Sequence, residues 1–293
     1  MSEVSPQAEA NDTELAATKR PLLFPPFYAI MQRKGMTAMF SVDQTLCIRC
    51  GSCVKVCPLG IFSVTEDGSI APAQKKCLDC FHCTATCPVR AITCEGMDRE
   101  ACYPTPAPEG TLLRRFQDRR SIRHFKDTLP DRAQIQAALD GAAYAPSGHN
   151  ERPYQWTVVL GRERVEQIRR LVLDWAETVP AFHHLIWADR HGRDPITCGA
   201  PCLIFAHAPR TAPTGQIDAI IAAALAEQLL SDAGLGACWG GYLGRAVVLY
   251  PELRAALDLP EDHDVYSALM VGYPAERYPN LPPRPAAAIR WIK

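Results

Sequence analysis

Eight cysteines between positions 47 and 87 have a spacing that suits iron–sulfur chemistry. They form two copies of the pattern C-x2-C-x2-C-x3-C-P, and the second copy begins thirty residues after the first. Three closely spaced thiolates can bind one cubane cluster, whereas a fourth cysteine set apart and followed by proline ligates the other cluster of a pair. The pattern therefore predicts two [4Fe–4S] clusters with exchanged ligands: Cys47, Cys50, Cys53 and Cys87 for one, and Cys77, Cys80, Cys83 and Cys57 for the other.

Two zinc sites or plain buried thiols are the alternative interpretations of this block. Zinc sites also use C-x2-C pairs, but neither alternative explains the third spacing or the prolines at 58 and 88. Residues 41–95 resemble bacterial-type two-cluster ferredoxins, with all eight ligand positions filled. The resemblance implies a module that passes single electrons to a second domain. The remaining cysteines lack ligand-spaced partners and are expected to be small buried side chains: Cys94, Cys102, Cys198, Cys202 and Cys238.

A second group of residues, downstream, suits a phosphate and a planar ring. Three arginines and a serine lie within residues 119–123, and the planar fork of arginine suits phosphate. Taken alone, a basic segment is more often a solvated face than a ligand site. The turn at 145–150 adds small residues, backbone N–H groups and an amide, and the glycine-rich stretch at 233–241 lets backbone approach a ring closely.

In this order, these segments make residues 111–293 resemble the nitroreductase family of FMN enzymes. The resemblance implies a homodimer with FMN at the subunit interface. The implied FMN contacts are Arg119, Arg120, Ser121 and Arg123 at the phosphate and the polar edge of the flavin; Pro146, Ser147, Gly148 and Asn150 against the flavin of the other subunit; Trp239, Gly240 and Gly241 against the ring; and Arg284, which returns to the phosphate.

The chain departs from the family pattern in two places. Residues 151–154 read Glu-Arg-Pro-Tyr where the family often has Gln-Pro-Trp, and Gly241 stands where some members place glutamate. No G-x-G-x-x-G fingerprint opens a helix after a strand, so a separate Rossmann domain is not expected, although NAD(P)H would bind at the flavin face itself. His149 lies in the flavin turn and is as compatible with an exposed turn residue as with a proton donor.

The elements that must position these residues are read from hydrophobic periodicity. Helices are expected at 131–145, 162–177 and 216–233, and buried strands at 155–160, 202–208 and 265–271. The third helix is apolar nearly all round, but Asp218, Glu227 and Gln228 argue against a membrane span. The fold class is therefore α+β, a two-cluster ferredoxin-like domain followed by a flavin domain with a central sheet flanked by helices. The expected boundaries are 1–40 for an N-terminal extension, 41–95 for the ferredoxin-like domain, 96–110 for a proline-rich linker and 111–293 for the flavin domain.

Composition limits the classes of function. The chain has 293 residues, 47% hydrophobic and 22% charged, with a net charge of −1, which supports neither nucleic-acid nor anionic-membrane partners. The polar start does not look like a signal peptide, so a cytoplasmic location is expected. The predicted function is transfer of electrons from an external low-potential donor, a ferredoxin or NAD(P)H, through the clusters and FMN to a nitroaromatic, quinone or similar small conjugated acceptor. The alternatives are an electron carrier that serves a protein partner without a small-molecule substrate, and a redox sensor.

Overall fold

The computed structural model describes residues 40–73, 75 and 77–292. The expected N-terminal extension, residues 1–40, lies outside the described residues except for Phe40. No helix in the described part of the chain has the length and apolar character needed to span a membrane.

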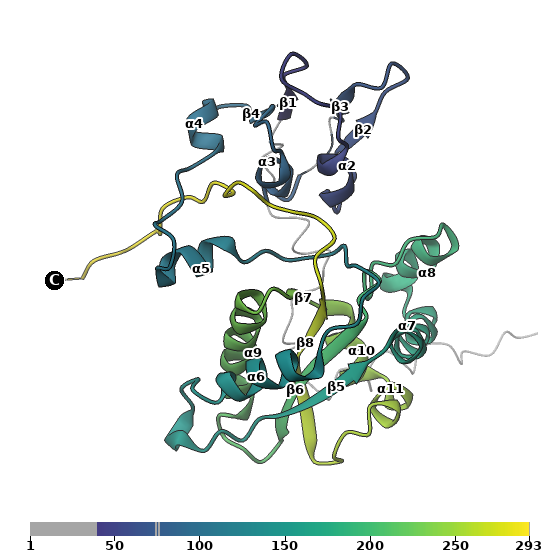
Figure 1. The fold of residues 1–293 in the computed structure, drawn as a ribbon. Coiled ribbons are helices and arrows are strands. Elements are labelled where there is room, and N and C mark those ends of the chain that lie inside the picture. The colour runs from purple at the N-terminus through teal and green to yellow at the C-terminus, as the bar shows by residue number, and fades with distance from the viewer. Residues whose placement is uncertain (1–39, 74, 76, 293) are drawn as a thin grey trace, which may run out of the picture. The chain divides into compact units, whose positions relative to one another are not determined.

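The cysteine-rich module consists of two short hairpin-like sheets and two matching helices (Figure 1). One sheet pairs β1 (Phe40–Val42) with β4 (Ile92–Cys94), and the other pairs β2 (Phe62–Val64) with β3 (Ile70–Pro72), both antiparallel. The helices are α2 (Ser52–Val56) and α3 (His82–Thr86). Buried aliphatic and aromatic side chains from the strands pack around the cysteines, so the module has its own small core.

The proline-rich segment at 96–110 contains a helix that the sequence did not predict. Helix α4 (Arg99–Cys102) begins after Asp98, whose carboxylate accepts a hydrogen bond from the N–H of Ala101 at 2.7 Å. The hydroxyl of Tyr103 donates to the carbonyl of Ile92 at 2.8 Å and accepts from its N–H at 3.1 Å. Cys102 and Tyr103 are buried in the core of the cysteine-rich module. The first part of this segment is therefore packed structure.

The larger α+β part is built on a four-stranded antiparallel sheet in the order β5-β6-β8-β7. The strands are β5 (Gln155–Leu160), β6 (Cys202–Pro209), β7 (Gly236–Trp239) and β8 (His263–Gly272). The α-helices are α5 (Leu112–Asp118), α6 (Arg132–Ala142), α7 (Arg162–Glu177), α8 (His183–Arg190), α9 (Gly215–Asp232), α10 (Gly241–Leu249) and α11 (Pro251–Ala256). Two short 3₁₀ turns, η1 (Gly148–Asn150) and η2 (Pro180–Phe182), complete the described elements.

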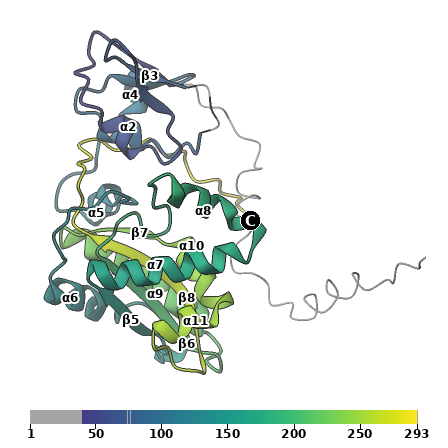
Figure 2. The ribbon, with the colours of Figure 1, turned by 90° about the vertical axis from the view of Figure 1, so that its right-hand side faces the viewer.

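The helices cover both faces of this sheet (Figures 1 and 2). Along β6, Leu203 and Phe205 point into a core shared with α7, α10 and α11. The alternate residues, Cys202 and Ile204, point into a core shared with α6 and α9. Successive strand residues face opposite sides, so a strand that is buried on both faces reads as a continuous apolar run.

The expected elements are largely confirmed. The strand at 155–160 and the helix at 162–177 have the predicted bounds, and the other two strands and the helix at 216–233 are shifted or extended by one or two residues. The helix expected over 131–145 ends at Ala142. The prediction of a loop over the glycine-rich stretch is wrong in part, because residues 236–239 form strand β7, which pairs with β8. The glycine at position 236 makes this strand look like a loop in the sequence. A Cβ at Gly236 would lie 2.5 Å from a side-chain carbon of Ile122, so the tight packing requires glycine.

Candidate functional site: a cysteine pocket and an arginine cluster

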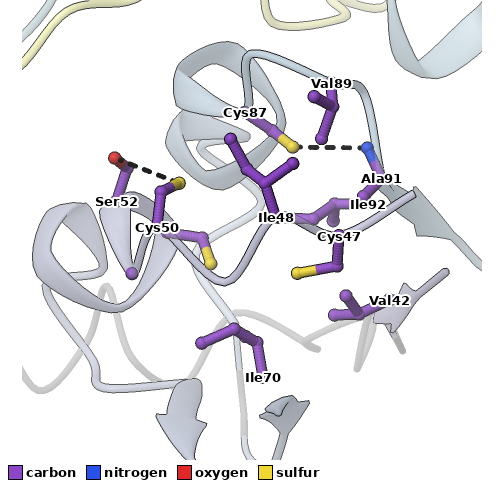
Figure 3. Close-up of a pocket in the computed structure, with 12 residues that line it drawn as sticks. Val42, Cys47, Ile48, Cys50, Ser52, Ile70, Cys87, Val89, Ala91 and Ile92 are labelled. Atoms are coloured by element: carbon purple, nitrogen blue, oxygen red, sulfur yellow. Dashed lines mark hydrogen bonds between the residues drawn. The ribbon is translucent and has the colours of Figure 1, made fainter. Parts of the chain in front are cut away.

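Four of the cysteines line one pocket, which Figure 3 shows with Cys47, Cys50 and Cys87 around it. Cys53 is the fourth, and aliphatic side chains of Val42, Ile48, Ile70, Val89 and Ile92 make up most of the remaining wall. Three of these cysteines come from the first copy of the repeat and one from the second. The pocket thus joins the residues that the spacing assigned to one cluster.

The electrostatic neighbours of Cys53 and Cys83, one buried thiol from each copy of the repeat, divide the eight cysteines in the same way. Burial, together with the neighbouring thiols of Cys87, Cys50 and Cys47, raises the pKa of Cys53 to about 12. Burial also raises the pKa of Cys83, and there the contributing cysteines are Cys80, Cys77 and Cys57. In each set, the fourth member belongs to the opposite copy of the repeat.

Neither set of four cysteines is arranged around a single point, as the ligands of one metal ion would be. Among the described residues, no three His, Cys, Asp or Glu side chains converge on a site for a single metal ion. The four ligands of a [4Fe–4S] cubane lie around a body of eight atoms, and they are therefore held apart by the cluster itself.

The two copies repeat their backbone conformation as well as their cysteines. Left-handed φ angles occur at Arg49 and Asp79 (56° and 49°) and again at Gly60 and Arg90 (59° and 53°), each pair thirty residues apart. The backbone N–H of Arg49 donates to Cys47 Sγ at 3.4 Å, and that of Asp79 donates to Cys77 Sγ at 3.3 Å.

The outlying cysteines accept a matching pair of hydrogen bonds. Ile61 N–H donates to Cys57 Sγ and Ala91 N–H to Cys87 Sγ, both at 3.2 Å. Backbone N–H groups aimed at sulfur stabilise negative charge on a thiolate and raise the reduction potential of a bound cluster. Both copies therefore provide backbone N–H groups that donate to the sulfur atoms of their cysteines.

The arginines at 119–123 follow α5, which begins after Thr111, whose hydroxyl accepts from Arg114 N–H at 3.2 Å. Beyond the helix the chain is extended, and Ser121 forms a parallel bridge to Ala237 in β7. Ile122 N–H donates to the carbonyl of Ala237 at 2.9 Å. These contacts bring the arginine segment next to the strand that ends at Trp239.

Arg120 is buried and only partly satisfied. Its guanidinium donates to the backbone carbonyls of Gln117, Arg119 (2.8 Å) and Asn280 (3.2 Å), while its Nε has no partner among the described residues. Burial, together with the charges of Arg119 and Arg284, lowers the pKa of Arg120 to about 10. Like charges that are gathered with an unpaired buried donor indicate a site for an anion.

Several positive charges of the arginine cluster act on His82 in α3. Burial lowers the pKa of His82 to about 4, and the next causes, in order, are Arg123, Arg120, Arg284 and Arg119. The late arginine, Arg284, is exposed and donates to the carbonyl of Pro283 at 3.2 Å. The structure therefore brings together four arginines expected at the FMN phosphate.

Glu227 joins the arginine segment to the end of β7, and sequence reasoning did not assign it to the site. Its Oε1 accepts from Arg119 Nη1 and its Oε2 from Trp239 Nε1, both at 2.9 Å, and its side chain is buried. After Trp239, Gly240 is the N-cap of α10, where a Cβ would lie 2.8 Å from Leu243; Gly241 faces open space. The signal in the sequence was a carboxylate in the middle of the largely apolar helix α9.

The turn at 146–150 has different contacts. Gly148 N–H donates to Asp218 Oδ1 at 3.1 Å, and a Cβ at Gly148 would lie 2.4 Å from the hydroxyl of Thr214. His149 and Asn150 both have left-handed backbone, with φ of 49° and 59°. The contacts of Gly148 tie the turn to the start of α9 rather than to the arginines. This separation is compatible with the expected contact across a dimer.

The remaining residues that the sequence singled out lie in the cores or on the surface. Cys94, Cys102, Cys202 and Cys238 are buried, and Cys198 is partly buried. Among the aromatic residues at 182–187 and Tyr242, Phe182 packs edge-on to Tyr242 with ring centroids 6.2 Å apart, while Trp187 is exposed.

Two family models match the chain. The nitroreductase family matches residues 116–273, and the 4Fe-4S dicluster domain matches residues 39–88. A ferredoxin of Pyrobaculum islandicum is 44% identical over 52 residues, which is 18% of this chain and 49% of the ferredoxin. The iodotyrosine deiodinase of Thermotoga neapolitana is 25% identical over 173 residues, 56% of this chain and 89% of that protein.

Solved structures share the fold of the α+β part. A nitroreductase with bound FMN from Bacteroides fragilis aligns with a TM-score of 0.51 at 24% identity, over 64% of this chain and 96% of that one. An FMN-dependent nitroreductase from Clostridium difficile aligns with a TM-score of 0.52 at 20% identity, over 63% of this chain and all of that one.

Proposed function

This chain belongs to the nitroreductase family, and on that premise we propose that it is an iron–sulfur flavoprotein oxidoreductase that passes electrons from two [4Fe–4S] clusters to FMN and on to a small conjugated acceptor. The observation that carries the proposal is the position of α3. This helix lies between cluster-type cysteines, and Asn280 links it to the arginine cluster by hydrogen bonds to Thr84 (3.3 Å) and Arg120 (3.2 Å). The charges of Arg123, Arg120, Arg284 and Arg119 also lower the pKa of His82 in this helix. An electron-carrying module and an anion site therefore meet in one chain.

The cysteines would hold the clusters in the exchanged arrangement. Cys47, Cys50 and Cys53 with Cys87 line one pocket, and Cys83 has Cys80, Cys77 and Cys57 as its charged neighbours. The raised pKa of Cys53 means that a site without iron would hold a neutral thiol, so binding of the cluster must release protons. The match to a 4Fe-4S dicluster domain supports the count of two.

The arginine cluster would hold the phosphate of FMN. Arg120 offers an unpartnered buried donor, and Arg119, Arg123 and Arg284 add positive charge that Glu227 only partly neutralises. Trp239, Gly240 and Gly241 would face the ring, since Gly241 leaves its neighbourhood open. The bound flavin converts single electrons into two-electron chemistry, and the protein orients it and excludes water.

The acceptor that we propose is a nitroaromatic, a quinone or a similar conjugated molecule. The donor would be a ferredoxin or NAD(P)H. We further propose a homodimer located in the cytoplasm, in which Pro146, Ser147, Gly148 and Asn150 approach the flavin of the partner. The left-handed backbone at Asn150 and the anchoring of Gly148 to Asp218 support a rigid turn suited to that role.

The test is anaerobic and begins with composition. The purified protein should contain about eight irons, about eight acid-labile sulfides and one FMN per chain. Flavin reduction is then followed with reduced ferredoxin and, separately, with NADPH, before a nitroaromatic is added. Rapid reoxidation by the nitro compound supports the enzyme. Protein with full cofactor content that stays reduced with every small acceptor would instead be an electron carrier for a protein partner, and protein without flavin would defeat the proposal.

A further inference from the structure

The two copies of the cysteine repeat share a backbone but differ in burial. In the first copy, Cys50 and Lys55 are exposed, while the equivalent Cys80 is half-buried and the equivalent Ala85 is fully buried. All five residues of α3 are buried, but only two of the five in α2 are. Because the conformations match, the difference comes from what covers the second copy.

The cover is the segment that follows β8, and Asn280 is its central residue. Its Nδ2 donates to the carbonyls of Thr84 (3.3 Å) and Cys87 (2.7 Å), and its backbone N–H donates to that of Ala85 (3.0 Å). Carbonyls at the end of a helix have no partner within the helix, so Asn280 satisfies groups that would otherwise be unpaired. Its Oδ1 accepts from Arg90 Nε at 3.1 Å. Asn280 thus anchors the C-terminal end of α3 through hydrogen bonds.

The same segment continues into the arginine cluster. The backbone carbonyl of Asn280 accepts from Arg120 Nη2 at 3.2 Å. In the same segment, the ring of Tyr278 lies 5.6 Å from the ring of His82, and Thr86 Oγ1 donates to the carbonyl of Arg277 at 2.9 Å. Asn280 therefore contacts both α3 and an arginine of the proposed phosphate site.

We infer an order for electron flow, which rests on the function proposed above. The cluster held by Cys77, Cys80, Cys83 and Cys57 lies next to the flavin, the cluster held by Cys47, Cys50, Cys53 and Cys87 accepts electrons from the donor, and Asn280 is the positioning residue that maintains this order. The donor at the clusters is a one-electron carrier such as a reduced ferredoxin: two molecules of it, each oxidised by one electron, balance one two-electron reduction of FMN, with protons taken from water. Exposure of Cys50 suits entry at the first copy, and burial of α3 against residues 277–280 suits exit at the second.

The first experiment identifies the signal of each cluster by placing a negative charge beside it. Ile48 and Leu78 occupy equivalent exposed positions beside Cys47 and Cys77, at 60% and 45% exposure. Ile48→Glu and Leu78→Glu should each lower the reduction potential of the nearer cluster, which an EPR-monitored redox titration identifies. The dianionic phosphate of FMN should act on the flavin-side cluster in the same direction. The signal that Leu78→Glu shifts is therefore expected to shift upward when FMN is removed from the wild-type protein.

Two outcomes would overturn the order. If removal of FMN moves the signal marked by Ile48→Glu, the clusters are in reverse order; if it moves neither signal, neither cluster lies beside the flavin. Wild-type protein that lacks iron or FMN at the start would instead defeat the proposed function, so the two failures are distinguishable.

The second experiment tests Asn280 with a substitution that conserves size. Asn280→Asp retains the oxygen that accepts from Arg90 but removes both side-chain donors to α3. Electron transfer from dithionite-reduced clusters to FMN should slow by roughly ten- to a hundredfold, the order of loss caused by misplacement of about 1 Å in other reactions. Rapid freeze-quench EPR and the visible absorbance of the flavin follow the two steps separately.

The control is Glu276→Gln in the same segment, which removes a 3.8 Å ion pair with the exposed Lys55 of α2 and leaves the hydrogen bonds of Asn280 in place. Its internal transfer is expected to match that of the wild type. An Asn280→Asp protein with full cofactor content and unchanged internal transfer would remove Asn280 from the positioning role.

Discussion

Glu227 accepts a hydrogen bond from the indole Nε1 of Trp239 at 2.9 Å, and its other oxygen accepts from Arg119 at the same distance. A single buried carboxylate thus joins the start of the arginine segment to the end of β7. Both donors belong to residues that the family resemblance assigns to the flavin. A buried charge that is paired twice is costly to disturb, because any change leaves a donor unsatisfied.

Substitution Glu227→Gln is expected to destabilise the protein. The amide has one acceptor and one donor group, so either Arg119 or Trp239 must face an N–H group. The free energy of unfolding should fall by about 1–3 kcal/mol, the usual cost of a buried unsatisfied group. Urea denaturation monitored by circular dichroism measures this. Glu163→Gln, at an exposed position in the first turn of α7, is the control; an equal loss in both variants would contradict the role of Glu227.

Substitution Arg120→Lys is expected to weaken FMN binding. Lysine keeps the positive charge but lacks the planar fork that donates to three carbonyls and leaves Nε free for an anion. Loss of one charge-assisted hydrogen bond corresponds to about 1.5–3 kcal/mol, so the dissociation constant should rise roughly ten- to a hundredfold. Quenching of FMN fluorescence during titration of the apoprotein measures this constant.

Arg132→Lys changes an exposed arginine at the start of α6 and serves as the matched control. It should bind FMN as the wild type does. Equal affinity in Arg120→Lys and the wild type would remove Arg120 from the phosphate site.

Features encoded by local spacing could be predicted, and those that need distant contacts could not. The partition of the cysteines follows from a short repeat, and the helix at 162–177 follows from its periodicity. Strand β7 was missed because Gly236 resembles a loop residue until Ile122 is placed against it. The contact of Asn280 with Cys87 spans 193 residues of chain and leaves no local pattern. In the sequence, Glu227 stood out only as a charged residue in a largely apolar helix.

Paired cysteine substitutions test the exchange of ligands. If Cys47 and Cys87 share a cluster, replacing both with serine removes only that cluster and leaves roughly four irons per chain. Replacing Cys47 and Cys57 removes one ligand from each cluster and should leave almost no iron. Without exchange, the two results would be reversed. Iron analysis and EPR of the reduced proteins distinguish these outcomes, and Cys198→Ser should retain about eight irons.

A buried histidine pair predicts how stability depends on pH. His207 Nδ1 and His263 Nδ1 are 2.8 Å apart, so one must carry a proton and the other must accept it. His207 Nε2 lies 3.1 Å from Thr157 Oγ1, and Arg254 donates to the carbonyl of His263 at 2.8 Å. Burial, together with His263 and Arg254, lowers the pKa of His207 to about 4.

Because the pKa of the folded state is below the ordinary value of 6.5, the unfolded chain binds the proton more readily. The stability contributed by neutral His207 is fully present above about pH 6.5 and is lost as the pH falls toward about 4, by on the order of 3 kcal/mol. Urea denaturation across this range measures the slope. His207→Gln should flatten it, although carboxylates elsewhere also titrate near its acid end. His191→Gln, at an exposed position, should keep it. An unchanged slope in His207→Gln would place the acid sensitivity elsewhere.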